Sequence, residues 1–213
     1  MLRALPSLLR FLISALLLGS IVWQIADRIV HNVFRPGEYF AYFTIQSSMV
    51  AAVTLAVAGW FTLSGKEETR LLALVRLSVA CFAALTGIVY NLLLRGLPAP
   101  AADAGYNWPV IPNEVLHCWG PGLIALEFVL YAPTVRLGLK SGLWVWAFPF
   151  AWLGFSVIRG LASGWWPYWF INPTGEGGIS GMLAYVFGIM AFLYVLALVF
   201  LGLKKLRNSA TRA

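Results

Sequence analysis

The chain has 213 residues, of which 61% are apolar and 11% are charged, whereas soluble domains have about 45–50% and about 25%. This composition excludes a water-soluble globule, and the apolar residues suffice for roughly six membrane spans of about 20 residues each. The net charge of +7 is typical of a membrane-topology signal and predicts no nucleic-acid partner. Two cysteines and two histidines exclude a disulfide framework and predict no metal centre.

Six apolar segments are long enough to cross a bilayer, and each is bounded by charge, proline or glycine. They cover about 7–29, 41–63, 71–94, 113–133, 142–160 and 178–203. Arg3 and Arg10 precede the apolar run from Phe11 to Gly19, as in a signal peptide, but no cleavage site follows, so the first segment is interpreted as a span. We therefore predict an all-α polytopic membrane protein in which residues 1–213 form one transmembrane domain.

The charges and polar residues predict the orientation of these spans. Eleven of the 15 Lys and Arg residues lie at the termini and in the 2–3 and 4–5 loops. The opposite side has only Arg28, Arg35, Arg95 and Arg159. The positive-inside rule then puts both termini in the cytoplasm. Near the outer ends of the spans lie Thr44, Gln46, Ser47, Ser48, Tyr90, Asn91, His117 and Arg159. Because polar groups are costly in a bilayer, we expect a functional site that opens outward.

Thr44 and His117 are the candidate catalytic pair. Thr44 is expected about one turn below the outer end of the second span, and Asn113 is predicted to cap the fourth helix, which puts His117 at a similar depth. The positive ends of helices at this surface favour a neutral imidazole that accepts a proton from a hydroxyl. Alternatively, the Thr44 face packs on another helix and His117 is a structural hydrogen bonder. Glu114 either orients His117 or interacts with the helix dipole, and Glu127 is expected to be protonated or hydrogen-bonded within the bundle.

Four further residues are candidate substrate contacts. Ser47 and Ser48 share a helical face with Thr44, and Asn91 is at the outer end of the third span, so each is a candidate contact for the substrate or an oxyanion. Arg159 is a candidate for binding a carboxylate in a bidentate way, with an interfacial anchor as the alternative interpretation.

Several segments in this order resemble a known family. The resemblance is carried by residues 42–48, 89–96, 158–160 and 164–168, together with His117 and Pro121. From about 35 to 200, the chain resembles the bacterial branch of the androgen-induced-protein family of membrane proteins, whose animal members include the androgen-dependent regulator of tissue factor pathway inhibitor. It departs from the expected pattern at Ser48 and Asn172.

The resemblance implies an integral membrane hydrolase, without a metal or organic cofactor, that cleaves fatty acid esters of hydroxy fatty acids. Thr44 matches the threonine nucleophile of the family and His117 its histidine base. The expected location is the bacterial inner membrane, with lipid as the partner and no particular oligomeric state predicted. The alternative is a non-catalytic lipid-binding protein or a small transporter, although transporters more often show internal repeats and interrupted helices. A b-haem electron carrier is a third alternative, but it usually needs two axial histidines, and His31 lies in a loop.

Overall fold

The computed structural model describes residues 3–97 and 103–210, and these residues contain helices and no strand. The α-helices are α1 (Ala4–Val30), α2 (Pro36–Tyr39), α3 (Phe43–Leu63), α4 (Arg70–Val89), α5 (Val110–Glu114), α6 (Gly120–Leu130), α7 (Ala147–Ser163) and α8 (Gly178–Ala210). The π-helical turns are η1 (Tyr90–Leu94) and η3 (Val115–Trp119), and the 3₁₀ segments are η4 (Leu139–Trp146) and η5 (Trp169–Ile171). The predicted all-α class is confirmed.

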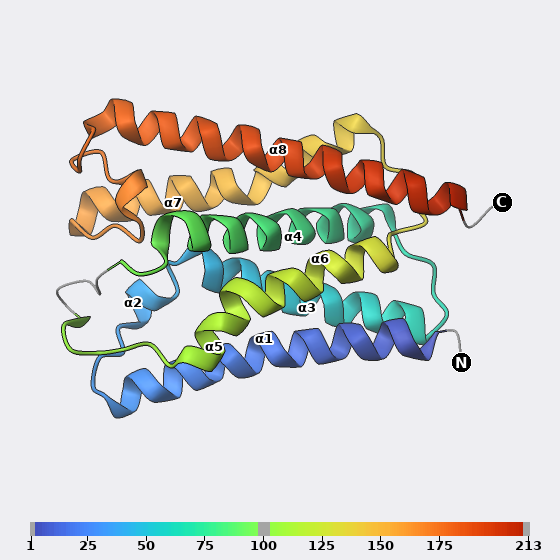
Figure 1. Cartoon of the computed structure of the whole chain (residues 1–213), viewed down its shortest axis with the longest axis horizontal. Helices are drawn as coiled ribbons and strands as arrows, with labels where there is room; N and C mark the ends of the chain where they lie inside the picture. Colours follow the sequence, from blue (N-terminus) through green and yellow to red (C-terminus); the bar gives the residue numbers. More distant parts are fainter. Residues whose placement is uncertain (1–2, 98–102, 211–213) are drawn as a thin grey trace.

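Five helical segments of the described chain are long and apolar enough to cross a membrane. They are Ala4–Val30, Phe43–Leu63, Arg70–Leu94, Leu139–Ser163 and Gly178–Arg207. Each corresponds to a predicted span, whereas the predicted span 113–133 is divided into α5, η3 and α6. The long helices run side by side, and α1 begins at the same end of the bundle at which α8 ends (Figure 1). This arrangement is consistent with a membrane protein.

Proline explains the division of the predicted 113–133 helix. Pro121 has no N–H to donate to the carbonyl of His117, and the Gly120 N–H instead donates to the Val115 carbonyl across the π turn. Gly87 of α4 permits a close approach here, because a Cβ at this position would lie 3.3 Å from the His117 carbonyl oxygen. The segment kinks without losing its contact with α4.

Two predicted helix starts are wrong. Asn113 does not cap a helix, because α5 begins at Val110 with Pro109 as its N-cap residue. Thr44 lies in the first turn of α3 rather than a turn deeper, because residues 36–39 form the separate helix α2. The corrections therefore put Thr44 at the very start of its helix and His117 farther from the start of its own.

The core and the outer surface of the bundle are both apolar. Leu17, Leu55, Leu77, Phe128 and Leu193 pack in its centre with almost no exposed surface. Val22, Ile158 and Phe187 are among many large apolar side chains that are more than half exposed. An apolar surface of this extent fits a surrounding lipid phase better than water.

A cluster of charges is buried at the end of the bundle where α1 begins. The Glu127 carboxylate accepts hydrogen bonds from Arg10 Nε at 2.6 Å and Arg76 Nη2 at 2.7 Å. Arg76 also pairs with Glu68 at 3.0 Å, and both arginines donate to the Tyr131 carbonyl. Buried charges require such partners, so the cluster ties α1, α4 and α6 together.

Candidate functional site

Thr44 lies between two cavities at the other end of the bundle. The first, here called the polar cavity, has a volume of about 320 Å³ and is lined by Thr44, Tyr90, Trp108, Asn113, His117 and Tyr168 among others. The second, here called the apolar cavity, has a volume of about 70 Å³ and is lined by Thr44, Thr86, Leu153, Tyr168, Ile189 and Met190 among others. Thr44, Leu94 and Tyr168 line both. These three side chains therefore form the boundary between the cavities.

His117 is held in a fixed orientation in the polar cavity. Its Nδ1 lies 2.9 Å from the backbone carbonyl oxygen of Asn113. Because a carbonyl only accepts, Nδ1 carries the proton, and Nε2 of the neutral ring has a free lone pair. The ring stacks on Tyr90 with 4.1 Å between centroids, and the Asn113 amide donates to the Tyr90 hydroxyl at 2.8 Å. This tautomer is suited to a general base.

The two π turns create this arrangement. Tyr90 is the first residue of η1, and His117 is the middle residue of η3. A π turn inserts an extra residue into a helix and is frequent at functional sites. Sequence reasoning missed both turns, although Pro121 was a signal for the second.

Thr44 is buried at the first turn of α3. Its backbone N–H, which has no helical partner at this position, donates to the Tyr168 hydroxyl at 3.5 Å. The Tyr168 hydroxyl also contacts the Thr44 side chain, and burial raises the pKa of this phenol, which keeps it protonated at neutral pH. Thr44 and His117 line one cavity, but in the described chain no hydrogen bond joins them.

The loop before α5, which includes Tyr106 and Trp108, covers one side of the polar cavity. Tyr106 and Trp108 line the cavity, and the Arg28 guanidinium carbon lies 5.1 Å and 4.5 Å from their ring centroids. Arg28 Nη2 also pairs with the buried Asp103 carboxylate at 3.0 Å. The end of α1 thus fixes the loop that covers His117.

The structure does not bring the predicted substrate contacts on α3 and η1 to this cavity. Ser47 and Ser48 line a separate void of about 10 Å³, and the Ser47 hydroxyl donates to the Thr44 carbonyl at 3.3 Å. Asn91 is exposed, where it donates to the Gly87 carbonyl at 2.7 Å. Neither the polar nor the apolar cavity includes these three side chains.

Arg159 and Glu114 also lie outside the two cavities. The Arg159 guanidinium stacks on Trp165 at 4.3 Å from the ring centroid. Glu114 pairs with Arg95 at 2.8 Å rather than with His117. In residues 3–97 and 103–210, no group of three or more His, Cys, Asp or Glu side chains is arranged to hold a metal ion.

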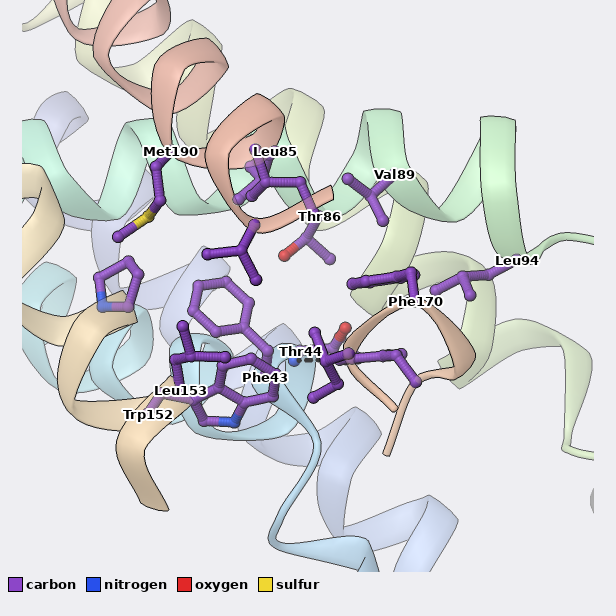
Figure 2. A pocket seen from close by; sticks show the side chains of 15 residues that line it. Phe43, Thr44, Leu85, Thr86, Val89, Leu94, Trp152, Leu153, Phe170 and Met190 are labelled. Atoms are coloured by element: carbon purple, nitrogen blue, oxygen red, sulfur yellow. Dashed lines mark hydrogen bonds between the residues drawn. The ribbon is translucent and has the colours of Figure 1, made fainter. Parts of the chain in front are cut away.

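Two hydroxyl groups near Thr44 were not found by sequence reasoning. Tyr168 comes from the loop between α7 and η5, and Thr86 comes from α4 (Figure 2 shows Thr86). Both lie far from Thr44 in the sequence, and no local pattern connects them to it.

Comparison of the chain with protein-family models, characterised proteins and solved structures gives no match in any of the three. The resemblance described above stays a prediction, and the function is argued from the site itself.

Proposed function

We propose that this chain is an integral membrane hydrolase that cleaves lipid esters with Thr44 as nucleophile and His117 as base. One observation carries the proposal: Thr44 lies at the boundary between an apolar cavity and a polar cavity that also contains His117, whose Nδ1 is within hydrogen-bond distance of the Asn113 carbonyl. An ester joins an apolar acyl chain to a more polar alcohol. Bound across this boundary, it would present its carbonyl carbon to the Thr44 hydroxyl.

The proposed reaction is a two-step acyl transfer. The Thr44 oxygen attacks the ester carbonyl while its proton passes to His117 Nε2, and the ester C–O bond then breaks as His117 returns that proton to the leaving alcohol. Water next attacks the acyl-threonine with the same base, releasing the fatty acid and restoring Thr44. Catalytic hydrogen bonds often form only with substrate present, so the Thr44 hydroxyl and Nε2 are expected to meet in the complex.

Tyr168 is suited to stabilise the oxyanion of this reaction. Its hydroxyl accepts from the Thr44 N–H, and the residue lines both cavities. A donor fixed before the reaction costs no reorganisation when negative charge develops on the carbonyl oxygen. We assign Tyr168 this role in place of Ser47 or Ser48.

The same proposal includes the topology and the substrate class. Six spans with both termini in the cytoplasm agree with the split of positive charges, provided that the kinked α5–η3–α6 segment also crosses the membrane. The polar cavity then opens outward from a bacterial inner membrane, and lipid enters laterally. Fatty acid esters of hydroxy fatty acids, which the family resemblance implies, have the required combination of apolar chain and more polar partner.

One observation favours the alternative of a non-catalytic lipid-binding protein or small transporter. The Thr44 hydroxyl and His117 are not hydrogen-bonded in the described chain, and the two cavities would serve equally to bind a lipid without converting it. The test below separates these functions.

Hydrolysis by purified variants tests the proposal. Thr44→Ala and His117→Ala should each lower kcat for a long-chain ester by about 100-fold or more, because a nucleophile and its base act as a unit. Thr44→Ser should retain part of the activity, and Ser47→Ala, whose hydroxyl lies outside both cavities, should be close to wild type. Turnover near the wild-type value in folded Thr44→Ala or His117→Ala protein would refute the mechanism.

A further inference from the structure

The Thr86 hydroxyl is a buried polar group without a partner. Thr86 is 7% exposed, and its Oγ1 has no hydrogen-bond partner in the described chain. Buried helical hydroxyls ordinarily donate to the carbonyl four residues earlier. Thr54 donates in this way to the Val50 carbonyl at 2.7 Å, and Ser78, on α4 like Thr86, donates to the Leu74 carbonyl at 3.0 Å. The free hydroxyl of Thr86 is therefore not a general property of its helix.

Thr86 lines the same apolar cavity as the proposed nucleophile, and it also borders the small void that contains Ser47 and Ser48. Figure 2 shows the side chains of Thr86 and Thr44 reaching into the apolar cavity from α4 and α3. The side chains that line the cavity are otherwise almost entirely apolar, and none of them is charged. A ligand in this space must bring its own hydrogen-bond acceptor to Thr86.

We propose that Thr86 is a substrate-binding residue whose hydroxyl donates a hydrogen bond to the neutral acyl carbonyl of a lipid ester. The inference rests on the proposed function and specifies how the substrate lies: its acyl chain enters the apolar cavity, and its alcohol part lies in the polar cavity. A neutral carbonyl fits because it accepts a hydrogen bond, whereas a carboxylate in this cavity would be desolvated without a counter-charge.

The size and position of the apolar cavity indicate where the rest of the acyl chain lies. Its volume of about 70 Å³ holds only the first part of a long chain. Val186 and Ile189 of α8 line it and are partly exposed at the outside of the bundle. The remainder of the chain therefore passes these two residues into the surrounding lipid.

Binding of two matched probes to full-length protein tests the role of Thr86. The probes are methyl oleate and 1-octadecene, which share an 18-carbon chain with one double bond and differ in the ester group and in the position of that double bond. Thr44→Ala is the parent so that the ester is not consumed. Adding Thr86→Val should weaken methyl oleate binding about 3- to 10-fold, the effect of one neutral hydrogen bond. Binding of 1-octadecene should not change, and Thr86→Ser, which keeps the hydroxyl, should resemble the parent.

Ser156→Ala is the matched control. The Ser156 hydroxyl is likewise buried without a partner, but it does not line the apolar cavity. Its removal should change binding of neither probe. Removal of the Thr86 hydroxyl should leave the melting temperature of the ligand-free protein unchanged or raised, because an unsatisfied buried group is lost.

Three results would overturn the inference: no binding of methyl oleate by the parent, equal affinity after Thr86→Val, or an equal loss of affinity for 1-octadecene. These results are distinguishable from failure of the proposed function. If the wild type hydrolyses the ester but binding does not depend on Thr86, only the role of Thr86 is refuted. If binding depends on Thr86 but the wild type hydrolyses no ester, only the hydrolase function is refuted.

Discussion

At the scale of single residues, the site depends on groups that orient His117 rather than on His117 alone. The Asn113 carbonyl determines which ring nitrogen carries the proton, and the stacked Tyr90 ring determines where the other nitrogen points. The Asn113 amide in turn holds the Tyr90 hydroxyl. The Asn113–His117 contact is local, whereas the stacking of His117 on Tyr90 depends on how the two π turns meet and does not follow from residue type.

Variants at Tyr90 test this orientation. Tyr90→Ala removes the stacked ring and should lower kcat by up to about 10-fold, in line with the energy of an aromatic pair. Tyr90→Phe keeps the ring and loses only the hydroxyl that accepts from Asn113, so its kcat should be closer to wild type. Steady-state kinetics of both variants give the comparison, and a larger effect of Tyr90→Phe than of Tyr90→Ala would contradict it.

Glu127 is predicted to stabilise the fold without taking part in the chemistry. Glu127→Leu leaves Arg10 and Arg76 buried without the carboxylate that they share, which should lower the free energy of unfolding by about 3–5 kcal/mol. Unfolding in detergent measures this loss, with the exposed Glu67→Gln as control. Full stability of the Glu127 variant would mean that the cluster is held by other contacts.

At the scale of elements, the sequence predicted where the helices lie better than how they begin and bend. Hydropathy predicts six spans, and five of them correspond to long apolar helices of the described chain, because length and apolar content are local properties. The sequence pattern puts Thr44, Ser47 and Ser48 on one helical face, which fits either a site or helix packing. In the structure, Thr44 lies at the helix start beside the cavities, whereas the serines lie one turn deeper, where α1, α4 and α6 close around them. That difference depends on neighbouring helices, which a single-helix pattern does not contain.

The prediction that Thr44 and His117 reach the same end of the bundle agrees with their shared cavity. The charge distribution and the helix directions are sufficient to predict this shared end. The sequence does not predict that Tyr168 and Thr86 line a cavity with Thr44, because that depends on tertiary packing.

The π turn η3 provides a prediction at this scale. Pro121→Ala restores an N–H that can pair with the His117 carbonyl, which favours an ordinary α-helical turn and moves His117 away from Tyr90. Ester hydrolysis should fall at least 10-fold while the melting temperature changes little, because an ordinary turn is itself stable. Pro6→Ala, in the first turn of α1, is the control. Unchanged kcat in Pro121→Ala would show that the π turn is not needed for activity.

At the scale of the whole molecule, the orientation in the membrane can be tested by labelling. Single cysteines replace Glu176 in the loop before α8 and Lys140 in η4, both exposed, in a chain without Cys81 and Cys118. An impermeant reagent applied from outside should label Glu176→Cys and not Lys140→Cys. The reverse pattern would invert the topology. Asp103 is unsuitable as a reporter because it is buried against Arg28.

The buried charge cluster also has a consequence for synthesis of the protein. Arg10 and Glu127 are separated by 117 residues, which take about 6 to 23 s to translate at 5–20 residues per second. Arg76 pairs with Glu68, which is only eight residues away. Arg10 of α1, in contrast, has no carboxylate partner until Glu127 of α6 has been synthesised. During that interval Arg10 is expected to stay at the interface by extending its side chain toward water. Final seating of the first helix is therefore a late event, completed only after more than half of the chain has left the ribosome.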